Sequence, residues 1–524
     1  MTSTWLEGLR ASILPAALLA LPLVLLGFPG SGELRASPQG EAVRHLWALE
    51  RARATGSLSG WTDLVDYPDG ATWSVIDPGN LPAYALGHAL GGPAVGWNLL
   101  LWVGLALGGA GGWYLARQVG ADRWGQGLGL AIGASSPGLL QAAADGMTEV
   151  LGIGLVALQL GGLIGLARSQ RARYLVPVVV GIAGAAWMGP YNAVWVALID
   201  IPIGLYLLSQ RRWLHLVAGG LGALLAAPVL LLSLAQDSGA PGGSARGTIT
   251  ALDGSGWRGA TRAGADLLDL VVPEPLLQQV AVLPATAYLG LLLPILALVG
   301  LWRWRSGWPW LLAAISFSAL ALGVMVTVRG VPTGWAGPAA WLELVPPLDR
   351  LSRWYRAGAL VPFLCIPLAV RARPGPASAL LALLVVLDAR LLAPLPLRWA
   401  SVEMPGAAFE QLRRPVVPFP SDQSEPSAGR LADGPLLAQL VHGQPVLYQL
   451  NEGEFDHQLA HALWLAEVPE TTPVGLRMLQ ERGFTTLEVH TDHASEAQLR
   501  ALEELFPAPS FEQGPVRIYD LEAL

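Results

Sequence analysis

Charge is scarce in this sequence of 524 residues: only 14% of them are charged, whereas soluble globular proteins carry about 25%. Hydrophobic residues make up 53%. A long chain this apolar is typical of a protein that crosses a membrane many times, rather than of a row of soluble domains. The formal net charge of -7 and the lack of a basic stripe argue against binding to nucleic acid.

Cysteine and lysine are also scarce. The single cysteine, Cys365, lies in an apolar run, which excludes a disulfide framework and a cysteine metal site. All 32 residues counted as Lys+Arg are arginines. This bias extends over the whole chain, so it indicates codon usage more than a preference for bidentate phosphate contacts at particular sites. Gly-rich phosphate loops, nucleophile elbows and kinase signatures are missing as well.

Long apolar runs recur as far as residue 394. Each is close to the ~20 residues that a helix needs to cross about 30 Å of hydrocarbon. We therefore predict an α-helical polytopic membrane protein with about eleven transmembrane helices. The predicted spans are residues 11–29, 94–116, 126–142, 149–167, 174–189, 191–208, 213–235, 284–302, 308–328, 356–371 and 377–394.

The arginines predict the orientation of these spans. They occupy every second short connection, whereas the intervening loop 143–148 has Asp145 and no basic residue. Because positively charged loops stay inside, we expect a cytoplasmic N-terminus and, after an odd number of spans, a C-terminus outside. The arginines of the inside loops are Arg117, Arg123, Arg168, Arg171, Arg173, Arg211, Arg212, Arg303, Arg305, Arg371 and Arg373.

Two domains are expected. Residues 1–398 form the transmembrane domain, with large outer loops at 30–93, 236–283 and 329–355. Residues 399–524 form an extracytoplasmic domain, in which seven arginines from Ser401 onward face nineteen acidic residues. Strand-like and helix-like segments alternate there, which predicts a small α/β domain with a partly parallel sheet. The strand-like segments are 415–420, 445–450, 484–490 and 516–521, and the helix-like segments are 435–441, 473–482 and 495–506.

The first outer loop concentrates residues that could carry chemistry. Glu41, Arg44 and His45 follow a helical spacing that places a carboxylate, a guanidinium and an imidazole on one face. Clustered carboxylates beside a bilayer suit a general base or a divalent cation, although a solvated loop with Asp-initiated turns has the same composition. Six acids crowd the part of this loop from residue 41 to residue 77: Glu41, Glu50, Asp63, Asp66, Asp69 and Asp77.

An arginine row precedes the tenth span. Arg350, Arg353 and Arg356 are spaced by three, so a helix would present them together to a lipid phosphate. Trp354 and Tyr355 between them would sit at the level of the headgroups, which is equally typical of a helix that lies among ordinary lipids.

Further titratable residues stand out at three places in the chain. Asp145 lies at a span boundary, where a buried charge needs a reason, but it could also cap the next helix, with Glu149 as its first-turn acid. Asp200, inside a span, is expected to face the bundle interior or a cavity. His457 and His461 are four residues apart without an HExxH frame, so we expect no metal site there.

Five stretches, in this order and topology, resemble the GT-C-type membrane glycosyltransferases of bacteria and their large uncharacterised branch. The first is Gly40-Glu41 followed by His45-Leu46-Trp47, and the others are residues 62–70, 113–117, 287–291 and 348–356. The resemblance covers most of the transmembrane part. It implies an enzyme of the bacterial inner membrane that transfers a sugar from a polyprenyl-phosphate donor to an envelope acceptor on the outer face.

The resemblance also implies roles for particular residues. Glu41 takes the place of the family's acidic residue, usually Asp, as general base or metal ligand, and Asp145 is the expected second acid. A divalent cation is the only cofactor left open, and the expected partners are the lipid-linked sugar and membrane lipids. The expected substrate-binding residues are Arg44, His45, Asp66, Asp69, Asp77, Arg350, Arg353 and Arg356.

A second function stays open. A membrane protein without enzymatic activity that binds or transports lipid-linked envelope precursors would have the same composition. Symmetric halves with broken helices would favour a transporter, and the sequence has no clear internal repeat. The sequence predicts neither the sugar, the acceptor nor the oligomeric state.

Overall fold

The structure is a computed structural model, and two compact units make up the chain. The first unit comprises residues 1–31, 76–238 and 244–399, and the second comprises 32–75, 239–243 and 400–524. The structure describes residues 21, 34–36, 42–65, 70–209, 213–236, 264–270, 272, 288–329, 331–345, 348, 351, 353–392, 400–402, 415–419, 439–440, 443–446, 457–491, 494–514 and 516–524.

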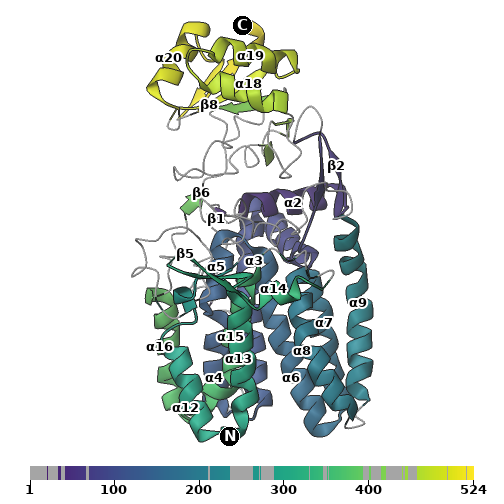
Figure 1. Cartoon of the computed structure of the whole chain (residues 1–524). Helices are drawn as coiled ribbons and strands as arrows, with labels where there is room; N and C mark the ends of the chain where they lie inside the picture. The colour runs from purple at the N-terminus through teal and green to yellow at the C-terminus, as the bar shows by residue number, and fades with distance from the viewer. Residues whose placement is uncertain are drawn as a thin grey trace, which may run out of the picture. The chain divides into compact units, whose positions relative to one another are not determined.

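The first unit is built of apolar helices (Figure 1). Except for the short α14, which lies in the predicted outer loop 329–355, they lie along the predicted spans; the first span, 11–29, falls outside the described residues apart from Leu21. The helices are α3 (Leu81–Gln118), α4 (Arg123–Ala134), α5 (Pro137–Asp145), α6 (Ile153–Ser169), α7 (Leu175–Met188), α8 (Pro190–Ser209), α9 (Leu214–Gln236), α12 (Leu292–Arg303), α13 (Trp308–Ala321), α14 (Ala339–Leu342), α15 (Val361–Ala372) and α16 (Ala377–Leu392).

Four of the described helical stretches are long and apolar enough to cross a membrane by length and composition: Pro78–Gln118, Thr148–Ser169, Leu214–Leu231 and Trp354–Ala372. The chain is thus a membrane protein built mostly of helices. The count of about eleven spans stays a prediction, because the other apolar helices are shorter than one crossing requires or include residues outside the description.

Helix breaks modify three of the predicted spans. The span 126–142 consists of α4 and α5, which are separated at Ser135 and Ser136 because Pro137 begins the second helix. The span 308–328 ends as a helix at Ala321, and a hairpin of β4 (Met325–Val328) and β5 (Val331–Ala336) follows. Helix α3 begins before the predicted span 94–116 and is kinked ahead of Pro93, where Gly92 has φ +83°.

Glycines bring α3 into close contact with its neighbours. A Cβ atom at Gly112 would lie 2.2 Å from the carbonyl oxygen of Gly129 on α4, and one at Gly111 would lie 2.1 Å from that of Gly154 on α6. Small residues allow helix backbones to approach in a membrane, where no hydrophobic effect drives them together. The many glycines of this unit therefore act as packing surfaces.

The second unit joins part of the first outer loop to the C-terminal region. Strand β1 (Leu34–Ala36) pairs antiparallel with β6 (Ala400–Val402). Helix α2 (Ala42–Thr55) follows β1, and on it Trp47 donates a buried hydrogen bond of 2.7 Å from Nε1 to Oε1 of Gln439. The predicted loop 30–93 is therefore divided, since its residues 32–75 belong to the second unit.

A short hairpin continues this connection. Strands β2 (Ser59–Thr62) and β3 (Ala71–Ser74) pair antiparallel. Directly after β2, the carbonyl of Leu64 accepts a 3.0 Å hydrogen bond from the backbone N–H of Val446, which forms a parallel bridge to Val416. Backbone pairing thus runs from the first outer loop to the C-terminal sheet.

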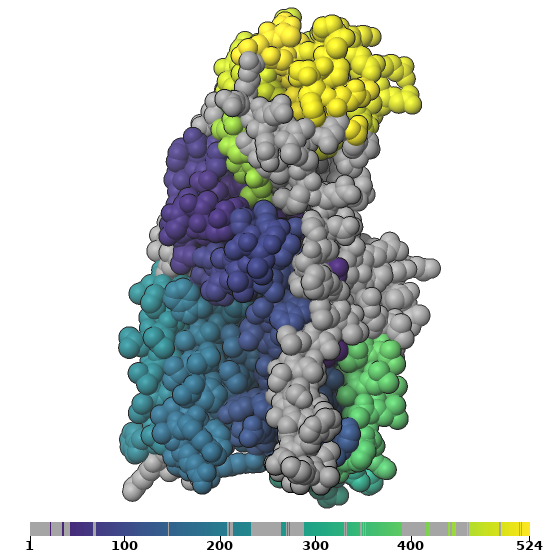
Figure 2. Space-filling model, turned by 180° about the vertical axis from the view of Figure 1, so that it is seen from behind, coloured from purple at the N-terminus to yellow at the C-terminus, as the bar shows by residue number. Residues whose placement is uncertain are grey.

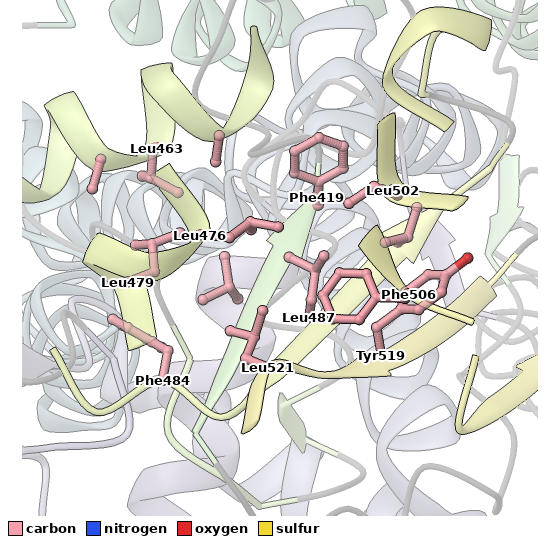
Figure 3. Close-up of a cluster of buried hydrophobic side chains, with 14 of the residues drawn as sticks. Phe419, Leu463, Leu476, Leu479, Phe484, Leu487, Leu502, Phe506, Tyr519 and Leu521 are labelled. Carbon is pink, nitrogen blue, oxygen red and sulfur yellow. The ribbon is translucent and has the colours of Figure 1, made fainter. Parts of the chain in front are cut away.

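The C-terminal sheet has the strand order β7-β8-β10-β9. Strand β7 (Val416–Phe419) is parallel to β8 (Thr486–His490), and β10 (Val516–Asp520) is antiparallel to both β8 and β9 (Phe511–Gln513). Helices α18 (His457–Glu467), α19 (Thr472–Glu481) and α20 (Glu496–Leu505) accompany the sheet. Figure 3 shows their apolar side chains meeting those of the strands in one buried core, which includes Phe419, Leu476, Leu487 and Tyr519.

Candidate functional site

Four of the ten predicted site residues lie outside the described part of the chain. Glu41, Asp66, Asp69 and Arg350 belong to this group. Asp145 is the last residue of α5, but the description does not extend to its side chain. The roles expected for these five residues stay predictions.

Arg44 and His45 are described on α2, in the second unit. Arg44 is exposed, whereas the side chain of His45 is only 8% exposed. Consecutive helical residues point about 100° apart, which explains the difference. The two side chains therefore lie in different environments.

Asp77 connects the start of α3 to the start of α6. Its side chain is 1% exposed and precedes the 3₁₀-helix η1 (Pro78–Asn80), which leads into α3. Oδ2 accepts a 2.7 Å hydrogen bond from Nδ2 of Asn80 and a second hydrogen bond from the hydroxyl of Thr148. Asn80 Nδ2 also donates to the carbonyl of Thr148 at 3.1 Å. Thr148 begins the 3₁₀-helix η2 (Thr148–Gly152), which leads into α6.

The next residue, Glu149, forms a buried ion pair with Arg356. The distance from Glu149 Oε1 to Arg356 Nη1 is 2.5 Å, and the two side chains are 1% and 6% exposed. The guanidinium also lies 4.6 Å from the centre of the Tyr191 ring, in the arrangement of a cation–π contact. Removing one partner of such a pair leaves an uncompensated buried charge, so each charge requires the other.

Arg353 has a different environment from Arg356. It is half-buried, and its backbone N–H donates a 3.1 Å hydrogen bond to the hydroxyl of Tyr191. The residues that follow form the 3₁₀-helix η10 (Trp354–Leu360), with Arg353 as its N-cap, where the sequence spacing suggested an α-helix. Trp354 is fixed in turn by a 2.9 Å hydrogen bond from Nε1 to Glu343.

We name Asp77, Thr148, Glu149, Tyr191 and Arg356 the acid–arginine cluster. Its members precede or begin four helical segments, which lead into α3, α6, α8 and α15 (Figure 1). Four helix N-termini, each with a partial positive charge, therefore meet at one place. The N-terminus of a helix favours a bound anion. The two carboxylates of the cluster supply negative charge there, but Arg356 and the nearby Arg353 add positive charge, so the site still favours a further anion.

A small cavity adjoins the cluster. Arg356, Tyr355, Gln141 and Met147 line it, and the Tyr355 hydroxyl lies 3.2 Å from the sulfur of Met147. The cavity has room for about one water molecule. It is too small for a sugar, so a substrate would have to contact the cluster from outside this cavity.

Three members of the cluster were not identified from the sequence. Glu149 was interpreted only as a first-turn acid, and Thr148 and Tyr191 were not singled out. The argument that a buried charge at a span boundary needs a reason was applied to Asp145, and it holds equally for Glu149 four residues later. Tyr191, at the start of α8, carries no comparable signal in a single sequence.

A divalent cation has no site among the described residues. They contain no group of three or more His, Cys, Asp or Glu side chains that could hold a metal ion. The Asp77 carboxylate already accepts hydrogen bonds from two donors, and Glu149 contacts a guanidinium. We therefore derive no step that passes through a metal.

Comparisons with known proteins find similarity only among solved structures, and that similarity concerns the fold. No protein-family model and no curated protein matches the sequence. Among solved structures, the arabinofuranosyltransferase AftD from mycobacteria matches with a TM-score of 0.50 and 17% identity, over 97% of this chain and 41% of AftD. The oligosaccharyltransferase of Archaeoglobus fulgidus, tethered to an acceptor peptide, matches with a TM-score of 0.48 and 11% identity, over 95% of this chain and 72% of that enzyme. The same archaeal enzyme, AglB, in complex with an inhibitory peptide and a dolichol-phosphate, gives a TM-score of 0.46 and 10% identity over the same shares, 95% and 72%.

The AftD match confirms the predicted resemblance at the level of the fold. The archaeal matches have TM-scores below 0.50 and add nothing to this conclusion. The chain spans about two fifths of the length of AftD, since the match covers 41% of that protein. At 17% identity, the match indicates that the two proteins share an arrangement of helices. It does not indicate that they catalyse the same reaction.

Proposed function

We propose that this chain is a membrane glycosyltransferase that transfers a sugar from a polyprenyl-phosphate donor to an envelope acceptor on the outer face of a bacterial inner membrane. The observation that carries the proposal is the meeting of four helix N-termini with Arg353 and Arg356, which suits the phosphate of a lipid-linked donor. The fold shared with a membrane glycosyltransferase supports it.

In the proposed reaction, a hydroxyl oxygen of the acceptor attacks the anomeric carbon of the donor sugar. Glu41 accepts the hydroxyl proton as general base, and Asp145 is the second acid. The bond between the anomeric carbon and the phosphate oxygen breaks with inversion, and polyprenyl phosphate leaves. Arg353, which is half-buried, holds the negative charge of that phosphate, whereas Arg356 is fixed behind it by Glu149.

The test is sugar transfer by the full chain in nanodiscs, with a panel of polyprenyl-phosphate sugars and matched expression levels. Glu41→Gln preserves the shape of the side chain but removes the charge, so transfer should fall by about 10²–10⁴-fold. Glu41→Asp should retain part of the activity. The control is Glu50→Gln, which removes another acid of the same loop, one that forms an ion pair with Arg53 on α2. Full turnover by Glu41→Gln would exclude a catalytic role for Glu41.

A second function is a membrane protein that binds or transports lipid-linked envelope precursors without catalysis. The buried Glu149–Arg356 pair favours it, because two charges that neutralise each other are unavailable for proton transfer. The two functions differ in one measurement. Retention of the polyprenyl-phosphate sugar in nanodiscs, with no transfer to any acceptor by the parent protein, would favour the second.

A further inference from the structure

A separate pocket lies within the helices of the first unit, between α8 and α9. Its volume is about 180 Å³. Apolar side chains and glycines form most of its wall, and Asp200 and His215 are its two titratable groups. For comparison, an apolar cavity of about 150 Å³ in another protein accommodates benzene. This space, which we name the α8–α9 pocket, therefore has room for a segment of a hydrocarbon chain but not for a whole lipid.

The glycines of the pocket are open. Added Cβ atoms at Gly204, Gly219 and Gly220 would meet no atom within 4 Å. Glycines 111 and 112 on α3 differ, because other helix backbones fill the space beside them. The glycines of α8 and α9 thus border on empty space that other helices do not occupy, so a ligand could enter it.

Two buried polar side chains have ring or amide atoms without hydrogen-bond partners here: His215 lines the pocket, and Gln159 contacts Asp200 of its lining. His215 is 6% exposed, and neither ring nitrogen has a hydrogen-bond partner in the described structure. Gln159 on α6 is fully buried and donates from Nε2 to Asp200 Oδ1, while its own Oε1 has no partner there. A buried imidazole without a partner is unfavourable, and a ligand with a suitable polar group would remove that penalty.

Exposed apolar side chains flank the pocket. On the flanking turns, Leu205 of α8 and Val217 and Leu221 of α9 are exposed apolar side chains. Figure 2 shows the helices of this region, coloured blue to teal, forming one surface of the first unit. Asp200 lies nine residues beyond Tyr191 on α8, or about 13 Å along the helix axis. The pocket is therefore distinct from the acid–arginine cluster, which lies at the start of that helix.

We infer that the α8–α9 pocket binds the chain of an uncharged membrane amphiphile that carries a hydroxyl group. A hydroxyl can donate to the Asp200 carboxylate and can donate to or accept from His215, whereas an ester oxygen can only accept. A phosphate or a carboxylate is unsuitable, because the described lining contains Asp200 and no arginine. The inference does not depend on the proposed glycosyl transfer.

Photocrosslinking of the full chain in nanodiscs tests the inference. Three sixteen-carbon diazirine probes are compared: an alcohol, a carboxylic acid and a hydrocarbon without a head group. The alcohol should label residues of α8 and α9 saturably and in preference to the other two. His215→Leu should reduce that labelling by about three- to tenfold, the effect of one lost hydrogen bond, and His215→Asn, which can still donate and accept, should retain most of it.

Gly219→Leu places a bulky side chain at a position where an added Cβ atom meets no atom within 4 Å, so it should occupy the pocket and abolish the labelling. The matched control is Gly127→Leu on α4, which also meets no atom within 4 Å but lies outside the pocket. Thermal unfolding checks that each variant is folded. Equal labelling by the alcohol and the hydrocarbon, stronger labelling by the acid, or labelling that persists in folded Gly219→Leu would each overturn the inference.

Discussion

At the scale of single residues, the acid–arginine cluster depends on one buried ion pair. Glu149 and Arg356 come from segments more than two hundred residues apart, and each is almost fully buried. Tyr191 covers the guanidinium, and Nδ2 of Asn192 donates a 2.6 Å hydrogen bond to the carbonyl of Glu149. The pair therefore connects the starts of three helical segments, so its loss should affect stability before it affects any chemistry.

Glu149→Gln should lower the free energy of unfolding by about 3–5 kcal/mol, because it leaves the Arg356 charge buried without a counter-charge. Denaturant titration in detergent measures the change. Glu496→Gln is the control, since its ion pair with Arg500 is exposed and should contribute little. The double variant Glu149→Gln, Arg356→Met should recover part of the lost stability, and no recovery would show that the pair is not the source of the effect.

Arg353→Gln tests phosphate binding. Arg353 is half-buried, and its backbone hydrogen bond to Tyr191 is preserved by the substitution. Loss of a bidentate, charge-assisted contact is worth about 1.5–3 kcal/mol, so retention of polyprenyl phosphate should weaken by about 10–150-fold. Native mass spectrometry measures the retention. Unchanged retention of polyprenyl phosphate would show that Arg353 does not bind this phosphate and only contacts ordinary lipid headgroups.

Residue chemistry was predicted from local clusters and spacing. Asp77 was identified among the acids of the first outer loop and Arg356 in the arginine row, and the structure brings them to neighbouring residues, Thr148 and Glu149. The partners could not be predicted, because an ion pair across two hundred residues leaves no local pattern. Arg44 and His45 lie on a helix as their spacing predicted, with Arg44 exposed and His45 buried.

At the scale of elements, close glycine contacts hold the helices of the first unit together. Gly129 of α4 has no room for a methyl group, since an added Cβ would lie 2.6 Å from the carbonyl oxygen of Gly112. Gly127, two residues earlier on the same helix, would meet no atom within 4 Å. The same substitution should therefore have opposite effects at these two positions.

Gly129→Ala should destabilise the protein by about 1–3 kcal/mol, because the added methyl group forces α3 and α4 apart. Gly127→Ala should be neutral or stabilise it by up to about 1 kcal/mol, the difference in helix propensity between the two residues. Thermal unfolding in detergent compares both variants with the parent. Equal effects at the two positions would contradict the close approach of α3 and α4.

Hydropathy predicted where most described helices lie, because in lipid a helix must satisfy its own backbone and the apolar run determines its extent. Hydropathy did not predict where the helices are interrupted. Pro137 divides one predicted span into two helices, and the predicted span 308–328 ends in a strand at Met325. Apolar composition is the same on both sides of such a break, so hydropathy cannot reveal it.

At the scale of the whole molecule, the second unit constrains the path of the chain through the membrane. Its two parts are joined by the pairing of β1 with β6, by the Trp47–Gln439 hydrogen bond and by the backbone contact between Leu64 and Val446. Residues 32–75 and 400–524 must therefore lie on the same side of the membrane. An even number of crossings must separate them, which the ten spans predicted between residues 94 and 394 satisfy.

Single cysteines test both this constraint and the predicted orientation. The native Cys365 is buried and is first replaced by alanine. Ser57→Cys and Ala508→Cys introduce thiols at exposed positions in the two parts of the second unit, and Ser169→Cys introduces one in an arginine-rich loop. A membrane-impermeant maleimide applied to intact spheroplasts should label positions 57 and 508, because positively charged loops stay in the cytoplasm. Position 169 should react only after the cells are opened. Labelling of 57 without 508 would contradict the pairing of β1 with β6, whereas labelling of 169 alone would preserve the pairing and reverse the orientation.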